Sequence, residues 1–225
     1  MSVAIILLLA AIASSAGLLI LQIGLWRVFA VAPQLKAQTF DSPPPETSLT
    51  VVIPAYNEAV NIGACLQSVL DSTSPCTAWA VLVVDDASTD ATAEIALQAA
   101  SDRSEICSVL QAGPRPAGER WVGKNWACSR AMEQVTSEWV LFIDADVRLS
   151  PDALRRALVQ AIEEKADLFS LAPRLECGCL AEWMVQPIMA SLLGLGFPIE
   201  ATNDPDSDVA FAAGPFMLFS SQAYA

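Results

Sequence analysis

Residues 139–146 have the sequence WVLFIDAD, a continuous apolar run that ends in two aspartates separated by one small residue. The run predicts a strand that is buried on both faces. If the chain bends out of a sheet here, Asp144 and Asp146 can reach one divalent cation, and hard cations prefer carboxylate oxygens. The pattern therefore predicts a metal site. It is also consistent with one aspartate capping a helix that begins near Pro151.

Two earlier segments have the same form, a strand followed by polar residues. One is LTVVIPAYNE, residues 49–58, in which Pro54 is expected to stop the strand, and the other is AVLVVDDASTD, residues 80–90. Periodicity predicts helices over 61–70, 89–100, 125–135 and 151–165, and further strands over 106–111 and 167–172. Alternating strands and helices predict an α/β fold with a doubly wound, mostly parallel sheet. Ligands of such sheets bind at the carboxyl edge, where all three motifs lie.

The N-terminal segment predicts a membrane anchor. Residues 1–26 contain no charged residue, and an apolar run of about 20 residues is long enough to cross a bilayer as a helix. A cleaved signal peptide is the alternative, but basic residues usually precede its apolar stretch. Here Arg27 and Lys36 follow the run, which places the remainder in the cytoplasm. We therefore expect a single-pass anchor over 1–26, a juxtamembrane linker over 27–48 and a cytoplasmic domain over 49–225.

Composition excludes several classes of function. The formal net charge of −13 argues against nucleic-acid binding, which needs a basic surface. The absence of histidine excludes imidazole bases and histidine-ligated zinc. Six cysteines occur without a C-x-x-C pair, so no zinc template is matched. Oxygen ligands remain, and these favour Mg²⁺ or Mn²⁺.

The polar residues after the first two strands are suited to binding a nucleoside. Asp86 can accept hydrogen bonds from a nucleobase or a ribose, Tyr56 can lie against a base, and Glu58 can bind the nucleoside. Each has a structural alternative as well. The segment around Tyr56 is equally consistent with an ordinary strand-to-helix turn, and Ser88 and Asp90 are candidates for helix capping.

Together the three motifs resemble glycosyltransferase family 2. VIPAYNE (52–58), VDDASTD (84–90) and FIDAD (142–146) match its signatures in order and spacing, and the resemblance covers residue 49 to the end. It implies the GT-A fold and an inverting transfer of sugar from a nucleotide-diphosphate sugar. It also implies that Asp144 and Asp146 hold Mg²⁺ or Mn²⁺ at the diphosphate. The implied substrate-binding positions are Pro54, Ala55, Tyr56, Glu58, Asp86, Lys124, Asp144 and Gly214.

Two further segments narrow the resemblance. GERWVGKNWA (118–127) and AGPFMLF (213–219), which is followed by Ala223 and Tyr224, are similar to a subgroup associated with hopanoid or carotenoid glycosylation. This similarity implies a lipid or isoprenoid acceptor at the membrane. Lys124 is expected either to contact the nucleotide phosphates or to be a solvated loop lysine.

The segment 182–198 is almost wholly apolar. Its composition is consistent with a membrane-facing or lipid-acceptor helix, and equally with buried core.

No catalytic base is assigned. The family resemblance places that carboxylate beyond the segment that ends at Tyr224, and the sequence stops at Ala225, so we expect a truncated chain without the base. The carboxylates at Asp204, Asp206 and Asp208 precede Gly214 and do not match the position.

Two other functions remain as alternatives. One is a membrane-tethered module, or a partner of another synthase, that binds a nucleotide sugar without activity. The other is a nucleotidyltransferase, although residues 54–58 lack the glycine and lysine of its phosphate loop.

Overall fold

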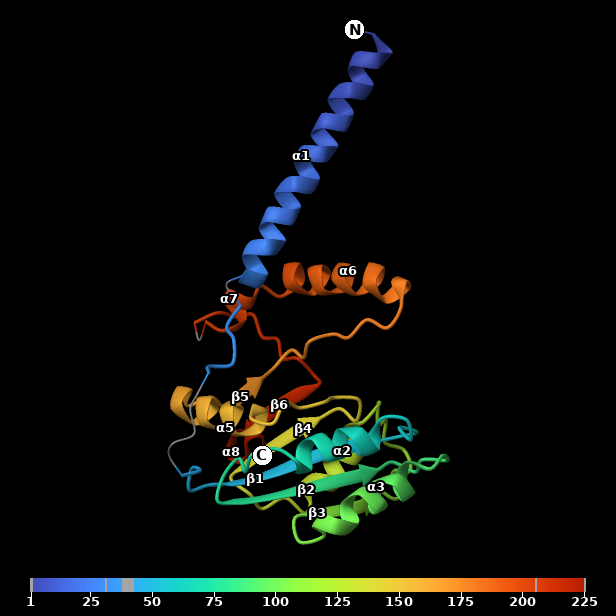
Figure 1. Ribbon diagram of the computed structural model, residues 1–225, viewed down its shortest axis with the longest axis vertical. Helices are drawn as coiled ribbons and strands as arrows, with labels where there is room; N and C mark the ends of the chain where they lie inside the picture. The colour runs from blue at the N-terminus through green and yellow to red at the C-terminus, as the bar shows by residue number, and fades with distance from the viewer. Residues whose placement is uncertain (1, 31, 38–42, 205, 225) are drawn as a thin grey trace. The chain divides into compact units, whose positions relative to one another are not determined.

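The computed structural model describes residues 2–30, 32–37, 43–204 and 206–224 (Figure 1). The chain divides into two compact units. The helical unit comprises Met1–Gln34 and Arg174–Phe211, and the sheet unit comprises Leu35–Pro173 and Ala212–Ala225. Residues 174–211 thus group with the N-terminal helix rather than with the sheet, whereas the sequence pattern assigned them to one domain over 49–225. Residue 1 of the predicted anchor, residues 31 and 38–42 of the predicted linker, and residues 205 and 225 lie outside the described part.

The sheet unit is built of alternating strands and helices, as predicted. Its strands are β1 (Ser48–Ala55), β2 (Ala78–Asp85), β3 (Cys107–Gln111), β4 (Trp139–Ile143), β5 (Leu168–Ser170) and β6 (Phe216–Ser220). Its helices are α2 (Ile62–Leu70), α3 (Thr92–Ala100), the short 3₁₀ helix Ser101–Arg103, α4 (Asn125–Met132), α5 (Ala153–Glu164) and α8 (Ser221–Tyr224). All predicted helices and strands of this unit are present, with ends shifted by up to three residues.

The six strands form one sheet in the order β3-β2-β1-β4-β6-β5. The first four are mutually parallel, and β6 runs antiparallel to both β4 and β5. The doubly wound, mostly parallel sheet is therefore confirmed. Following the chain, β2 and then β3 are added on one side of β1, and β4 is added on the other side of β1. This is a topological switch point, where ligands of open α/β sheets bind.

The prediction that Pro54 stops the first strand is wrong. β1 continues to Ala55 and pairs with β2 along its whole length. Its pairing with β4 covers only Leu49 to Val52, so the strand has already run past β4 when it reaches Pro54. A proline is tolerated where no ladder hydrogen bond is required of its nitrogen.

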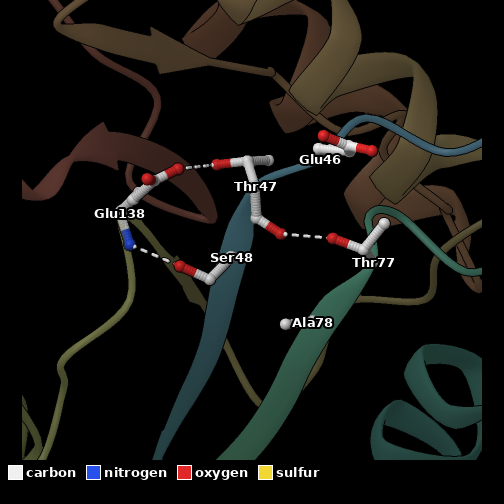
Figure 2. A pocket seen from close by; sticks show the side chains of 6 residues that line it. All are labelled: Glu46, Thr47, Ser48, Thr77, Ala78 and Glu138. Atoms are coloured by element: carbon white, nitrogen blue, oxygen red, sulfur yellow. Dashed lines mark hydrogen bonds between the residues drawn. The ribbon is translucent and has the colours of Figure 1, made fainter.

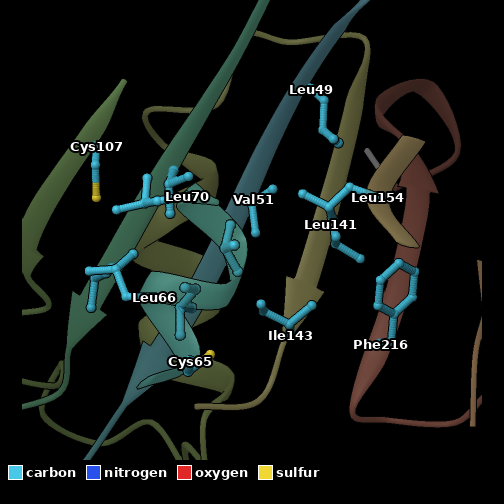
Figure 3. Packing of buried hydrophobic residues seen from close by; sticks show 14 of the residues in the cluster. Leu49, Val51, Cys65, Leu66, Leu70, Cys107, Leu141, Ile143, Leu154 and Phe216 are labelled. Carbon is cyan, nitrogen blue, oxygen red and sulfur yellow. The ribbon is translucent and has the colours of Figure 1, made fainter. Parts of the chain in front are cut away.

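Apolar side chains on both faces of the sheet form two cores. On one face, strand residues such as Val51, Leu141 and Ile143 pack with buried residues of α2, α3 and α5 (Figure 3). On the other face, Val52 and Phe142 pack with α4. Because both faces are covered, β4 is apolar throughout and β1 and β2 are apolar over most of their length, which explains why these strands were readily predicted.

The helical unit contains α1 (Val3–Ala30), α6 (Leu180–Gly196) and the short α7 (Ile199–Thr202). Residues 3–24 of α1 are long and apolar enough to cross a membrane, by length and composition. No residue of α6 is buried. The expectation that this segment forms buried core is therefore wrong for the described chain.

Candidate functional site

The three polar motifs follow the strands at the switch point. Tyr56 follows β1, Asp85 ends β2, and Asp144 follows β4. Because these three strands are parallel and adjacent, their carboxyl ends meet at one edge of the sheet. The backbone N–H of Asp86 donates to the carbonyl of Ala55 (2.9 Å), which joins the first two motifs directly.

The loops after β1 and β2 hold each other in place. The backbone N–H of Asn57 donates to Ser88 Oγ (3.0 Å), and the N–H of Thr89 donates to Asn57 Oδ1 (2.8 Å). Asn57 and Ala87 both have positive φ, 55° and 60°. Asparagine tolerates this conformation better than most residues, whereas alanine adopts it at a cost. The reciprocal hydrogen bonds compensate for that cost and fix the position of Tyr56, whose side chain is exposed.

Glu58 is held at the start of the segment that leads to α2. Its backbone N–H donates to Thr92 Oγ1 (2.8 Å), and its carboxylate accepts a hydrogen bond from Asn61 Nδ2 (3.0 Å). Asp90 accepts from the hydroxyl and the backbone N–H of Thr92, and also from the N–H of Ala59. The Thr92 hydroxyl bond holds the pKa of Asp90 below its usual value. Asp90 is thus a structural acceptor near α3, but the expected helix capping by Ser88 and Asp90 is wrong, because α3 is preceded by Ala91 and has no side-chain cap hydrogen bond.

The other predicted residues of the first two motifs differ in accessibility. Pro54 and Ala55 are buried within β1, so their side chains are covered. Asp86 is 8% exposed and Asp85 only 3%. Oδ1 of Asp85 has no hydrogen-bond partner among the residues that the structure describes. A buried carboxylate oxygen without a partner is costly, and a donor group on a ligand would relieve that cost.

Asp144 and Asp146 lie on a turn that directs both away from the core. The N–H of Val147 donates to the carbonyl of Asp144 (3.1 Å), closing the turn. Ala145 and Val147 are buried, whereas Asp144 is half-buried and Asp146 is exposed. Helix α5 begins at Ala153, and Asp152 is the residue that precedes it. The helix-capping alternative for Asp144 and Asp146 is therefore wrong.

Below this turn, the Cys65 thiol donates a hydrogen bond to the Asp144 carbonyl (3.6 Å). Burial raises the pKa of Cys65 to about 12. The thiol therefore stays protonated at neutral pH and supports the turn from the core side.

Lys124 contacts Asp144, one of the two predicted metal ligands. Its ammonium forms an ion pair with Asp144 and also donates to the carbonyl of Gly214 (3.4 Å). The N–H of Asp144 donates to the carbonyl of Pro215 (3.2 Å). Lys124 and Gly214, separated by 90 positions in the sequence, are thus brought together at Asp144. The alternative that Lys124 is a free, solvated lysine is wrong.

Arg115 is a site residue that the sequence interpretation missed. Its guanidinium pairs with Asp86 at 2.6 Å, while the arginine side chain remains 46% exposed. Arg115 and Lys124 lie near the two ends of one loop, residues 112–124, whose Gly113 and Gly123 have φ of 73° and 53°. Only the composition of the loop, in which Arg115, Arg120 and Lys124 alternate with glycines, could have indicated this.

Two carboxylates are available for a metal at this edge. No group of three or more cysteine, aspartate or glutamate side chains in the described chain could hold a cation without further ligands. Mg²⁺ is commonly bound by one or two carboxylates together with water and substrate phosphates. The pair Asp144 and Asp146 fits that arrangement, and Asp144 already balances a positive charge in its ion pair with Lys124.

A shallow pocket lies at the opposite, amino-terminal edge of the sheet (Figure 2). It is lined by Glu46, Thr47, Ser48, Thr77, Ala78 and Glu138. Two carboxylates and no basic side chain line it, which is unfavourable for a diphosphate. Its polar groups also bond one another: the N–H of Glu138 donates to Ser48 Oγ (2.9 Å), and the Thr77 hydroxyl donates to the Thr47 carbonyl (3.2 Å). The carboxyl edge of the sheet, where the three motifs lie, is therefore the better candidate for binding a nucleotide-diphosphate sugar.

Comparison with known proteins gives relatives for most of the chain. The 4,4'-diaponeurosporenoate glycosyltransferase of Staphylococcus aureus (strain bovine RF122 / ET3-1) is 32% identical over 193 residues, which are 85% of this chain and 48% of that protein. The uncharacterized glycosyltransferase YibD of Escherichia coli (strain K12) is 28% identical over 135 residues, 60% of this chain and 34% of that protein. The chain spans about half or less of the length of these relatives.

Two solved structures share the fold. The mannosyltransferase PcManGT from Pyrobaculum calidifontis, in complex with GDP-Man and Mn²⁺, has a TM-score of 0.56 at 22% identity, covering 95% of this chain and 55% of that one. The glucosyl-3-phosphoglycerate synthase from Mycobacterium tuberculosis, in complex with phosphoglyceric acid, has a TM-score of 0.51 at 23% identity, covering 78% and 57%. At these identities the likeness concerns the fold alone.

The family described as Glycosyl transferase family 2 matches residues 50–225, which include all three motifs and both basic side chains of the site. The chain belongs to glycosyltransferase family 2 and has the GT-A fold.

Proposed function

We propose that the chain binds a nucleotide-diphosphate sugar at the carboxyl edge of its sheet and transfers the sugar to a lipid or isoprenoid acceptor. The observation that carries this proposal is the grouping of Asp86, Asp144 and the basic residues Arg115 and Lys124 at the switch point. Carboxylates suit a nucleoside and a metal, and cations suit a diphosphate.

Each group has a chemical role in this proposal. Asp86 and Glu58 accept hydrogen bonds from the nucleoside, and the exposed ring of Tyr56 stacks on the base. Lys124 exchanges its Asp144 partner for a phosphate oxygen. Arg115 similarly becomes free to pair with a phosphate when the nucleoside takes Asp86.

Asp144 and Asp146 would hold Mg²⁺ or Mn²⁺ together with diphosphate oxygens. The bound cation would neutralise the charge that develops on the diphosphate leaving group. In an inverting transfer, the acceptor hydroxyl oxygen forms a bond to the anomeric carbon while the bond from that carbon to the diphosphate breaks. The hydroxyl proton passes to a base, for which no residue of this chain is proposed.

The acceptor class is inferred from two features. The S. aureus relative is named for a carotenoid-type acid, 4,4'-diaponeurosporenoate, and α1 is suited to a membrane. An apolar acceptor would reach the enzyme from the bilayer. We further propose that α1 is a single-pass anchor and that the sheet unit faces the cytoplasm, because Arg27 and Lys36 follow the apolar run.

The experiment that tests the proposal is a screen of nucleotide sugars by thermal shift, with and without Mn²⁺. Binding stabilises the folded state by an amount set by ligand concentration over Kd, so a bound donor raises Tm. A shift with one class of nucleotide sugar that requires Mn²⁺ is expected. No shift with any nucleotide would contradict the proposal.

A second candidate function is donor binding without transfer. It is favoured by the ion pairs at this edge: Asp86 pairs with Arg115 and Asp144 pairs with Lys124, so both carboxylates are engaged by basic side chains and neither is suited to deprotonate an acceptor hydroxyl. Radiolabelled sugar transfer by this chain and by a longer chain of relative-like length would separate the two. If both chains bound the nucleotide sugar and only the longer chain transferred the sugar, the present chain would have the binding role alone.

A further inference from the structure

Helix α6 exposes apolar side chains around most of its circumference. Its 17 residues include one charged residue, Glu182, in the first turn, and none of the 17 is buried. Its exposed large apolar residues are Leu180, Trp183, Met184, Val185, Ile188, Met189, Leu192, Leu193 and Leu195. Apolar patches of this extent are uncommon on monomeric soluble proteins and mark surfaces that contact something else.

The partly covered face of α6 has the opposite character. Gln186, Ala190 and Gly194 recur at every fourth position, and together with Ser191 they are the only half-buried residues of the helix. The small and polar residues thus face protein, while the large apolar residues face outward. On a helix that lies against a core in water, the pattern is reversed. A helix with this inverted pattern is suited to an apolar solvent.

Length and connectivity argue against α6 crossing a membrane. Seventeen residues extend about 25 Å, less than the hydrocarbon core of about 30 Å. The chain leaves the sheet after β5 and returns in β6, and these strands are paired, Ser170 with Met217. A crossing would require the acidic return segment to pass back through the bilayer. That segment carries Asp204, Asp206 and Asp208, all exposed.

We propose that α6 is embedded in the interfacial region of the membrane and contacts lipid through its apolar surface, as a second membrane contact beside α1. α6 contacts α1, the helix that contains the candidate membrane span, and both belong to one compact unit. Trp183 lies in the first turn of α6, next to Glu182. Tryptophan is enriched where proteins contact the headgroup region of a membrane. The inference is independent of the proposed transfer reaction.

The acidic residues around α6 indicate which force would hold it at the membrane. Glu176, Glu200 and the three aspartates flank the helix, and Arg174 is the one basic residue in 174–204. Attraction to anionic headgroups therefore cannot hold α6 at the surface. Burial of apolar area must do so, and it is insensitive to salt.

The test uses spin labels on the full chain in neutral phosphatidylcholine liposomes. Flotation alone is uninformative, because α1 would anchor the chain in any case. The parent carries Cys177→Ser and Cys179→Ser, which removes the exposed thiol and its neighbour and leaves the other four cysteines. Cysteine is introduced at Ile188 or Leu192, which are 60% and 58% exposed, and at Leu97 of α3, which is 57% exposed and serves as the matched control.

Accessibility to oxygen and to nickel-EDDA is then measured by power saturation. Labels at residues 188 and 192 are expected to be reached well by oxygen and at least about fivefold less by nickel-EDDA than the label at 97, at both low and high salt. Nickel access equal to that of residue 97 would place α6 in water and overturn the proposal. Low access to both reagents would show that protein covers α6, and would equally overturn it.

Discussion

Substitution of Lys124 by methionine should change metal binding and nucleotide binding in opposite directions. Lys124 pairs with Asp144, the residue proposed to hold the cation, so a metal must displace the ammonium before it can bind. When nucleotide is present, the ammonium is expected to move to the diphosphate. Methionine keeps the length and apolar body of the side chain and removes only its charge.

The magnitude follows from the exposure of the pair. The side chains of Lys124 and Asp144 are 35% and 33% exposed, so solvent screens much of their attraction. Measured values for such partly exposed pairs are about 0.2–1 kcal/mol. With about 1 kcal/mol, Lys124→Met should tighten Mn²⁺ binding without nucleotide by about fivefold. Loss of a charge-assisted bond to phosphate should weaken diphosphate binding by about 1.5–3 kcal/mol, or roughly 10–150-fold.

The assay combines two titrations. Free Mn²⁺ is followed by its electron paramagnetic resonance signal without nucleotide, and nucleoside diphosphate binding is followed calorimetrically with saturating Mn²⁺. Lys36→Met is the matched control, because Lys36 also pairs with a carboxylate, Glu164, at 3.0 Å in the same unit. It corrects for the loss of one positive charge from an acidic protein. If Lys124→Met left Mn²⁺ affinity unchanged relative to this control, or weakened both affinities together, the reasoning would be refuted.

Three further predictions concern other parts of the molecule. Asp86→Asn should weaken nucleotide binding by about 1–2 kcal/mol, or roughly tenfold, and leave Mn²⁺ affinity without nucleotide unchanged, as measured by the same two titrations. Phe142→Ala should lower the free energy of unfolding, measured by denaturant titration, by about 3–5 kcal/mol, because Phe142 is 2% exposed and packs on Phe219 and Tyr224. As the control, Val122→Ala should change this free energy by less than about 0.5 kcal/mol, because the side chain of Val122 is exposed. Burial raises the pKa of Cys65 to about 12 and that of Cys107 and Cys128 to about 11, so these thiols stay protonated at pH 8. Iodoacetamide should therefore modify the exposed Cys179 first, as followed by mass spectrometry. Early modification of Cys65 would contradict its buried position.

The strands and their motifs were predictable because their cause is local. β4 is apolar at every position since both faces of the sheet are covered, and this alone marks residues 139–143 as a buried strand. The placement of Asp144 and Asp146 at its end follows directly. The extension of β1 through Pro54 was not predictable, since it depends on β4 ending its pairing two residues earlier.

The contacts of the site depend on loop conformation and were largely hidden in the sequence. Arg115 reaches Asp86 from 29 positions away, through a loop whose path is set by Gly113 and Gly123 in left-handed conformations. The outward-facing surface of α6 was equally undetermined. An apolar segment has the same composition whether protein or lipid covers it, and only the exposure of Ile188 and its neighbours separates the two.

The central claim is that Asp144 and Asp146 hold the cation of a nucleotide-sugar donor. Its most direct test is calorimetric titration of the nucleotide sugar found by the thermal-shift screen into Asp146→Asn and Glu105→Gln, each with and without Mn²⁺. Asp146 and Glu105 are both exposed carboxylates, so the second variant controls for charge. Mn²⁺-dependent affinity should fall by at least about tenfold in Asp146→Asn and stay unchanged in Glu105→Gln. Undiminished Mn²⁺-dependent binding by Asp146→Asn would contradict the claim.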